Sequence, residues 1–241
     1  SLSCCLTACR GSWTMRLAIG FVPKPFMTTQ IPTTSRQSHF GLQAQALTCV
    51  RGERKLFSGL NLSLTAGECL HVRGENGVGK TSLLRLLTGL SKPEAGQVLW
   101  NDKAISSDPS VFHRDVLFLG HRDALKEELT ALENLQMYAA LDDVKLSLEK
   151  ALGALARFGL RGRENLPVHC LSAGQKRRVL MARMFTRGAS LWILDEPFNA
   201  LDVNAVALLE GLMAEHLTSG GILVLTSHQA IHIPNVKALD L

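Results

Sequence analysis

The sequence has few aromatic residues, no long apolar run and, at its N-terminus, no acidic residues. No stretch approaches the roughly 18 uncharged apolar residues that a membrane-spanning helix needs, so any role at a membrane has to come through a partner. Apolar residues still make up 46% and charged residues 20% of the 241 positions, which is typical of a folded globular protein. The length suits one α/β domain with a sizeable core.

The net charge of +5 is spread unevenly, because the first 52 positions contain no Asp or Glu. A nucleic-acid groove would need clustered Lys and Arg side chains together with stacking aromatics. Aromatic residues make up only 5% of the chain, and no such basic cluster is found along it. We therefore expect no nucleic-acid partner.

The six cysteines include no Cys-x-x-Cys pair and no spacing typical of a zinc site. Cys49, Cys69 and Cys170 lie among apolar neighbours in the sequence. We interpret them as small core residues of a protein in a reducing compartment.

Residues 1–40 are rich in Ser and Thr and show no clean apolar period, which predicts an unstructured leader or a mis-assigned N-terminal extension. An Arg- and Ser-rich segment without acids is also typical of organelle targeting peptides. A translation start placed too far upstream is the favoured interpretation, because Ser1 opens the chain and Met27 begins a plausible short leader. The folded domain is expected over residues 41–241.

From Leu42 onward, short apolar runs alternate with helical periods, which predicts an α/β fold with a mostly parallel sheet covered by helices. The expected strands are residues 42–49, 56–64, 69–72, 98–100, 116–119, 191–194 and 222–226. The expected helices follow Lys80, Leu132, Leu148, Ser172 and Val203. Residues from about 121 to 188 are poor in strand signals and predict a helical subdomain inserted between two strands.

A phosphate-binding loop follows the strand that ends at Arg73. It fits G-x-x-x-x-G-K-[ST] and consists of Gly74, Glu75, Asn76, Gly77, Val78, Gly79, Lys80, Thr81 and Ser82. Glycines let successive backbone N–H groups point at a phosphate, and the N-terminus of the following helix adds a partial positive charge. The Lys80 ammonium is expected on the β and γ phosphates, and the Thr81 hydroxyl on Mg²⁺.

Two carboxylates end the apolar run Leu191–Leu194. Asp195 is placed to anchor hydrated Mg²⁺ beside the phosphate loop, and Glu196 to act as general base on the attacking water. Acids also cap many surface strands, so this pair alone does not establish a site.

A turn just upstream of this strand consists of Leu171, Ser172, Ala173, Gly174 and Gln175 and leads into the basic run Lys176-Arg177-Arg178. Ser172 is a natural helix N-cap and Gly174 leaves backbone N–H groups accessible, so the turn is a second candidate anion site. Taken alone, it is equally a plain helix start.

The order of these motifs, followed by Asn199-Ala200-Leu201-Asp202 and by Ser227-His228, resembles the nucleotide-binding domain of ABC transporters across residues 42–241. The resemblance implies a P-loop NTPase fold, the ABC-type core sheet with an inserted helical subdomain, and an ATP hydrolase that uses ATP and Mg²⁺. It also implies a head-to-tail homodimer in which Ser172 and Gly174 contact the γ-phosphate in trans. Residues 199–202 would then cross the dimer interface, and His228 would sense the γ-phosphate.

Two positions depart from the pattern of the family. His121 stands where a glutamine is usual, and its imidazole can still accept from magnesium-bound water, with a charge that depends on pH. The aromatic residue expected before Leu56 to stack on adenine is absent, and Arg51 lies near that place. A guanidinium can stack on a base, so we expect nucleotide binding with altered base selectivity.

Leu119-Gly120-His121, Leu125-Lys126 and residues 129–135 together resemble the ATP-binding subunit of the haem exporter of cytochrome c maturation. The resemblance implies multi-span membrane permease subunits as partners, membrane association only through them, and a place on the cytoplasmic face of the bacterial inner membrane. The energy of ATP would serve haem export or the release of a haem-loaded chaperone.

Other classes fit the sequence less well. Soluble ABC ATPases of translation or DNA repair usually carry two cassettes or a long coiled coil, and the sequence has neither an internal repeat nor sustained heptads. A P-loop kinase would have no use for the Leu171–Gln175 turn. A binding-only subunit would not need both Glu196 and His228.

Overall fold

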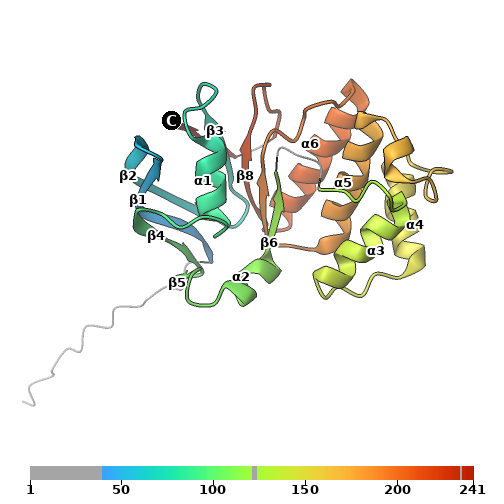
Figure 1. Ribbon diagram of the computed structural model, residues 1–241, viewed down its shortest axis with the longest axis horizontal. Coiled ribbons are helices and arrows are strands. Elements are labelled where there is room, and N and C mark those ends of the chain that lie inside the picture. The colour runs from blue at the N-terminus through green and yellow to red at the C-terminus, as the bar shows by residue number, and fades with distance from the viewer. Residues whose placement is uncertain (1–39, 121–123, 234) are drawn as a thin grey trace, which may run out of the picture. The chain divides into compact units, whose positions relative to one another are not determined.

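The computed structural model describes residues 40–120, 124–233 and 235–241. The predicted leader therefore lies outside the described residues except for Phe40, and His121 lies outside them as well. The described elements comprise nine strands, six α-helices and one 3₁₀ turn. Their arrangement is shown in Figure 1.

The strands form two sheets. The first has the order β2-β1-β4-β5 and is antiparallel, and the second has the order β6-β7-β8-β3-β9 and is parallel. The antiparallel sheet consists of β1 Gly41–Arg51, β2 Arg54–Thr65, β4 Ala95–Trp100 and β5 Lys103–Ala104. The parallel sheet consists of β3 Cys69–Arg73, β6 Val116–Leu119, β7 Leu191–Leu194, β8 Ile222–Thr226 and β9 Val236–Asp240.

The prediction of one mostly parallel sheet is wrong for the strands at residues 42–49, 56–64 and 98–100. Strand β1 pairs antiparallel with both β2 and β4, and Leu42 lies opposite Leu64 and Trp100. Only Gly52 and Glu53 separate β1 from β2. So short a connection can join only antiparallel neighbours, because a parallel pair needs a long crossover. Gly52 has a φ of 62°, the left-handed conformation that such a tight turn uses.

The helices occupy the positions that the sequence predicts, with one addition. They are α1 Lys80–Leu87, α2 Pro109–Asp115, α3 Ala131–Leu141, α4 Leu148–Arg157, α5 Ala173–Arg187 and α6 Val203–Thr218, and the 3₁₀ turn is Val168–Cys170. Helix α2, together with the short strands β5 and β9, was not predicted. Each has at most seven residues, which is too few to establish an apolar period.

Helices α3, α4 and α5 lie between β6 and β7 in the chain and pack on one another, which confirms the inserted helical subdomain. Leu135, Leu155 and Val179 come one from each helix, and each is at most 1% exposed. Capping boxes start two of the helices: Thr130 caps α3 and pairs with Glu133 in its first turn, and Ser172 caps α5 and pairs with Gln175 in its first turn. These caps satisfy backbone N–H groups that would otherwise lack partners.

Helix α1 packs between the two sheets. Leu83 and Leu84 are fully buried in the same core as Leu42 of β1 and Val224 of β8. Burying a leucine side chain stabilises a fold by about 1.5–3 kcal/mol. The N-terminus of α1 is thereby held rigidly against the C-terminal edge of the parallel sheet, next to the loop that precedes it.

The cysteine prediction is correct for two residues and wrong for one. Cys49 and Cys69 are buried, but Cys170 is exposed. It ends the 3₁₀ turn, whose inward positions are taken by Val168 and by the next residue, Leu171. None of the described helices is long and apolar enough to span a membrane.

Candidate active site

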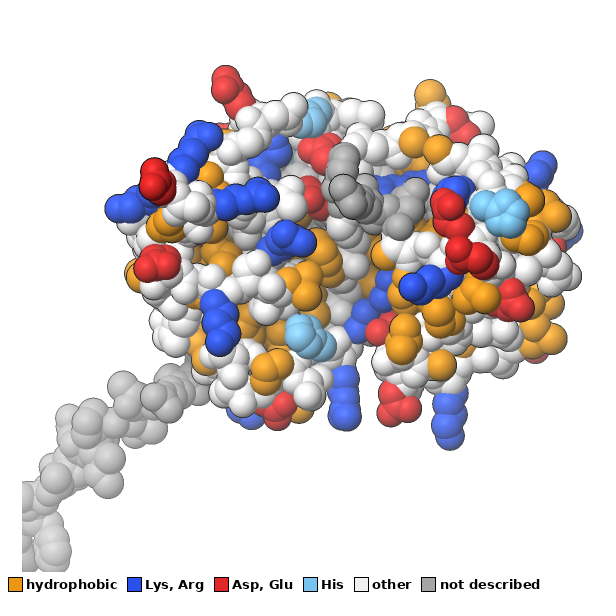
Figure 2. All heavy atoms as spheres, in the orientation of Figure 1, with side chains coloured by type: hydrophobic (Ala, Val, Ile, Leu, Met, Phe, Trp, Pro, Cys, Tyr) orange, Lys and Arg blue, Asp and Glu red, His pale blue; other side chains and the backbone are white. Residues whose placement is uncertain are grey.

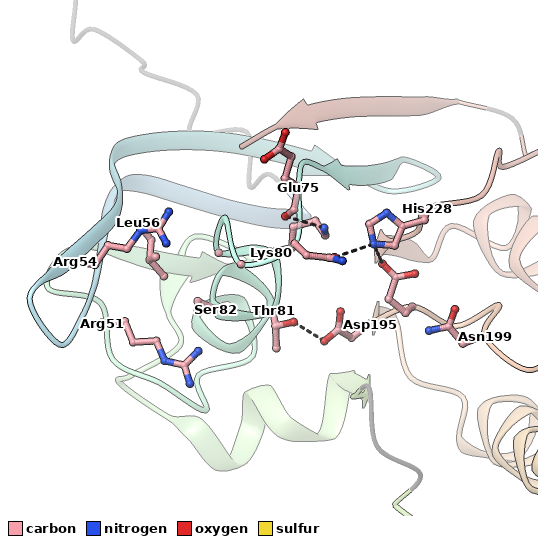
Figure 3. A pocket seen from close by; sticks show the side chains of 14 residues that line it. Arg51, Arg54, Leu56, Glu75, Lys80, Thr81, Ser82, Asp195, Asn199 and His228 are labelled. Atoms are coloured by element: carbon pink, nitrogen blue, oxygen red, sulfur yellow. Dashed lines mark hydrogen bonds and ion pairs between the residues drawn. The ribbon is translucent and has the colours of Figure 1, made fainter.

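The phosphate loop joins β3 to α1 and has a backbone that only glycine adopts easily. Gly74, Gly77 and Gly79 have φ angles of 139°, 83° and 125°. A Cβ at Gly74 would come within 2.9 Å of both Leu241 O and Val78 Cγ1. The loop is therefore curled tightly, with the N-terminus of α1 directly behind it (Figure 3).

Lys80 is the first residue of α1, and its side chain turns back over the loop. Its ammonium donates to Gly74 O at 2.7 Å and to Glu75 O at 3.2 Å, and the residue is only 9% exposed. An ammonium has three donors, so Nζ can still bind a further acceptor at the mouth of the loop. A phosphate oxygen is an acceptor of this kind.

Asp195 follows β7 and is 2% exposed. The Thr81 hydroxyl donates to its Oδ2 at 2.8 Å, and the Thr226 hydroxyl donates to its Oδ1 at 2.7 Å. The two hydroxyls come from α1 and from the end of β8, so the carboxylate joins the phosphate loop to the parallel sheet. Hydrogen bonds to both oxygens offset the burial of its charge.

Glu196 has a φ of 50°, which is rare for a residue with a side chain. Its N–H donates to Thr226 Oγ1 at 2.9 Å, and its carbonyl accepts from Arg177 Nη2 at 2.8 Å. Arg177 Nε also donates to Pro197 O at 3.2 Å. These contacts hold a strained backbone, a feature often found where a side chain is aimed at a substrate.

His228 faces Glu196 across the cleft, with Nε2 at 3.4 Å from Glu196 Oε1 and 3.1 Å from Asn76 Oδ1. The imidazole is 57% exposed, whereas the Glu196 side chain is 13% exposed. Oε1 of Glu196 is buried and has no hydrogen-bond partner among the described residues. A buried carboxylate oxygen without a hydrogen bond costs free energy, so this atom is available to a proton donor such as water.

These residues line one cleft with a volume of about 640 Å³. Its lining residues are Arg51, Arg54, Leu56, Glu75, Asn76, Gly77, Gly79, Lys80, Thr81, Ser82, Asp195, Glu196, Asn199 and His228. Two of the predicted loop residues, Gly74 and Val78, are not among them. Figure 3 shows Arg51 and Arg54 at one end of the cleft and Asn199 and His228 at the other.

The predicted turn Leu171, Ser172, Ala173, Gly174 and Gln175 lies outside this cleft, as do Ala200, Leu201 and Asp202. The turn and the segment 199–202 are neighbours, because a Cβ at Gly174 would lie 3.3 Å from Ala200 O. Asp202 caps α6 by accepting from Ala205 N and also accepts from Arg178 Nη2. These hydrogen bonds, first that from Ala205, hold the pKa of Asp202 below its usual value. The structure thus separates the two candidate anion sites within one chain.

The residues at the cleft also suit a magnesium ion. Mg²⁺ usually keeps several waters and takes one or two protein oxygens together with substrate phosphates. The Thr81 hydroxyl and the Asp195 carboxylate supply oxygens of this type, 2.8 Å apart beside Lys80. Both Asp195 oxygens already accept hydrogen bonds, so this carboxylate fits a contact through bound water.

Sequence reasoning missed three residues that support the site. Thr226 and Arg177 hold Asp195 and Glu196, and Arg54 lines the cleft beside Arg51. The only signals were the position of Thr226 directly before Ser227-His228 and an Arg-rich start to a helix. Neither signal identifies a partner 19 or 30 residues away.

Comparison with known proteins matches residues 57–199 to the family described as "ABC transporter". The chain is 53% identical over 193 residues to the "Cytochrome c biogenesis ATP-binding export protein CcmA" of Dechloromonas aromatica, covering 80% of this chain and 95% of that protein. The protein of the same name from Escherichia coli K12 is 50% identical over 196 residues, covering 81% and 93%.

Solved structures agree on the fold. A putative ABC transporter ATP-binding protein from Pyrococcus furiosus superposes with a TM-score of 0.73 at 23% identity, covering 83% of this chain and 97% of its own. An ATP-binding cassette solved as a dimer in a post-hydrolysis state with ADP and Pi gives a TM-score of 0.67 at 25% identity, covering 78% and 88%.

Proposed function

Because this chain belongs to the ABC transporter family and groups there with the cytochrome c biogenesis ATP-binding export proteins, we propose that it is the ATP-hydrolysing subunit of an export complex. The complex would energise haem export, or the release of a haem-loaded chaperone, in c-type cytochrome biogenesis. The observation that carries the hydrolase assignment is the meeting of Lys80, Asp195, Glu196 and His228 at one cleft.

The phosphate loop binds the triphosphate of ATP through backbone N–H groups, the start of α1 and the Lys80 ammonium. Oε1 of Glu196 accepts a hydrogen bond from the attacking water and takes its proton as the bond to the γ-phosphorus forms. His228 Nε2 lies 3.4 Å from this oxygen, close enough to orient the water or contact a γ-phosphate oxygen. The products are ADP and phosphate.

Mg²⁺ neutralises charge on the β- and γ-phosphates when bound. Thr81 would hold it directly, and Asp195 would hold it through water. The hydrogen bonds from the Thr81 and Thr226 hydroxyls keep the Asp195 carboxylate oriented for this role.

The base end of the cleft consists of Arg51, Arg54 and Leu56 and includes no aromatic residue. We infer that a guanidinium stacks on the base. A stacked guanidinium contacts the face of the ring, which adenine and guanine share, and not the base edges that distinguish them. GTP should therefore be accepted almost as well as ATP.

The complete site needs a second copy of the chain. The Leu171–Gln175 turn lies away from the cleft of its own chain and carries the N-terminus of α5, where an anion binds well. In a head-to-tail homodimer, Ser172 and Gly174 would bind the γ-phosphate held by the partner. The solved post-hydrolysis cassette is a dimer, which supports this arrangement.

A second cleft of about 510 Å³ would take the multi-span permease subunits on the cytoplasmic face of the bacterial inner membrane. It lies between α2 and β6 on one side and α3 and α5 on the other. Its lining includes Leu90, Phe118 and Leu141 together with Arg114, Asp142 and Arg187, and Arg187 is paired with Asp142. Figure 2 shows hydrophobic and charged side chains along the furrow on this face. Such a surface suits an amphipathic partner helix.

The hydrolase assignment is tested by Glu196→Gln. The variant removes the proton acceptor but keeps the size of the side chain, so turnover should fall at least about 100-fold while ATP affinity stays within about threefold. ATP should then trap the variant as a dimer, measured by light scattering. Lys80→Ala is the matched control and should lose affinity itself. Normal turnover of the glutamine variant would remove Glu196 as the base.

The export assignment is tested by purifying the Glu196→Gln protein from its native membranes with ATP. Multi-span subunits and cytochrome c maturation components should accompany it, as identified by mass spectrometry and by an absorbance scan for haem. Recovery of ribosomal or repair proteins without membrane subunits would contradict the assignment while leaving ATP hydrolysis intact.

A further inference from the structure

His71 is a buried ionisable residue that the hydrolysis step does not use. It lies on β3, three residues before the phosphate loop, and is 6% exposed. Its Nε2 is 3.0 Å from Ser227 O, and its Nδ1 accepts from Arg73 Nε at 3.2 Å. A buried imidazole that is hydrogen-bonded through both ring nitrogens fixes the positions of its two partners.

The two contacts fix the tautomer of the ring. Arg73 Nε carries a hydrogen and can only donate, so Nδ1 of His71 must be the unprotonated nitrogen. Nε2 therefore carries the hydrogen and donates to the carbonyl of Ser227. Burial lowers the pKa of His71, although the Ser227 carbonyl opposes this effect. Among nearby charges, Arg73 also lowers the pKa, whereas Glu196 and Asp240 raise it. The ring is consequently neutral near pH 7.

Ser227 lies where the parallel pairing of β3 with β8 has ended. The last paired residues are Val72 and Thr226, so the side chain of His71 extends the link between these strands by one residue. Ser227 Oγ in turn accepts from Gln229 N at 2.9 Å. The backbone is thus anchored on both sides of His228.

These anchors matter because the side chain of His228 has little packing of its own. It is 57% exposed, and its contacts are to Asn76 and Glu196 across the cleft. A side chain without close neighbours takes its position from its backbone. The hydrogen bond from His71 therefore helps to set how His228 meets Glu196.

We propose that His71 is a positioning residue for hydrolysis, which acts through Ser227 to hold His228 against Glu196 and the γ-phosphate. The proposal rests on the proposed ATPase function. It predicts that the neutral Nε2–H donor, and not merely the volume of the ring, is needed at this position.

The first experiment compares His71→Leu with His71→Gln. Glutamine can donate through Nε2 to Ser227 O and accept from Arg73 through Oε1, whereas leucine can do neither. We expect leucine to lower kcat at least about tenfold with KM for ATP changed less than about twofold, and glutamine to keep kcat within about twofold. Equal losses in the two variants would overturn the proposal.

A double-mutant cycle with His228→Ala distinguishes an effect of His71 through His228 from a loss of activity with another cause. If His71 acts through His228, His71→Leu should change the remaining rate of the His228→Ala protein by less than about twofold. The same fold-loss in both backgrounds would mean that His71 acts elsewhere, and this would overturn the proposal even though the ATPase assignment stands. A wild-type protein without ATPase activity would instead refute the proposed function.

A measurement on the wild-type protein keeps the test valid if the leucine variant does not fold. Nitrogen-15 NMR of labelled histidine gives the tautomer of each ring, and the His71 signal is assigned as the one that His71→Gln removes. We expect a neutral Nε2–H ring at pH 7.5. A charged ring or the Nδ1–H tautomer would overturn the proposal.

Discussion

At the residue scale, one hydroxyl joins the carboxylate of Asp195 to the backbone of Glu196. Thr226 is fully buried, donates to Asp195 Oδ1 at 2.7 Å and accepts from the Glu196 N–H at 2.9 Å. It joins the proposed magnesium anchor to the proposed general base. The second of these bonds is made at the backbone of Glu196, whose φ is 50°.

Replacing Thr226 by valine keeps the shape and removes both hydrogen bonds. A buried N–H and a buried carboxylate oxygen lose their partner, at a cost of about 1–3 kcal/mol each. We expect turnover to fall about tenfold or more and the urea midpoint to drop. Thr218→Val is the control, because the hydroxyl of Thr218 bonds Ala214 O on an exposed part of α6. A Thr226→Val protein as active as the wild type would show that the hydroxyl does not organise the site.

The sequence predicts the residues proposed to contact ATP and Mg²⁺ better than the residues that support them. Lys80 and Thr81 belong to a loop whose spacing follows from phosphate geometry, and Asp195 and Glu196 end an apolar strand. The partners Thr226 and Arg177 are set only by how β8 and α5 pack beside β7. Such packing leaves no local pattern in the chain.

At the element scale, charged side chains join α3 to α5. Asp142 lies 3.6 Å from Arg183 Nη2 and 3.2 Å from Arg187 Nη1, and Arg183 stacks on the Tyr138 ring at 3.8 Å. The two guanidinium side chains are only 12% and 11% exposed. Burial lowers the pKa of both arginines, and Asp142 opposes that effect.

Replacing Asp142 by alanine should leave two largely buried cations without their carboxylate. We expect a loss of about 2 kcal/mol in the free energy of unfolding, less than for a fully buried pair because some solvent reaches the site. Urea denaturation measures the loss. Glu215→Ala is the matched control, since its pair with Arg157 is 35% and 60% exposed and should contribute under about 1 kcal/mol. Equal losses in the free energy of unfolding for Asp142→Ala and Glu215→Ala would contradict the expected difference between a buried and an exposed ion pair.

Element prediction succeeds where a short segment is continuously apolar and misjudges how strands pair. Strands β7 and β8 read as continuous apolar runs and are fully buried. The sheet partner of β1 depended instead on the two-residue connection at Gly52 and Glu53, which the apolar pattern does not encode.

At the scale of the whole molecule, stability should depend on pH through buried histidines. His216 stacks on Trp192 with ring centroids 3.9 Å apart, and burial lowers its pKa below the usual 6.5. Burial has the same effect on His71. In the unfolded chain each ring would take a proton near its usual pKa, whereas the folded protein keeps it neutral to lower pH.

The unfolded state therefore binds more protons below about pH 6.5, so stability is full above that pH and falls as the pH drops further. The slope should approach about 1.4 kcal/mol per pH unit for each histidine until the folded protein is protonated too. Urea unfolding between pH 7.5 and 5.5 measures it. His216→Gln keeps a donor for Ile222 O but cannot titrate, so it should flatten the slope. An unchanged slope would show that His216 does not contribute to the pH dependence of stability.

The exposed Cys170 makes the chain suited to site-directed spectroscopy. Cys49 and Cys69 are buried, and burial raises the pKa of the Cys69 thiol to about 12, which makes it a poor nucleophile. After replacement of the cysteines at positions 4, 5 and 9, a maleimide probe should attach to Cys170 alone. That residue lies two positions before Ser172. A fluorophore or spin label there would test, in real time and away from the phosphate loop, whether the proposed dimer closes and opens during turnover.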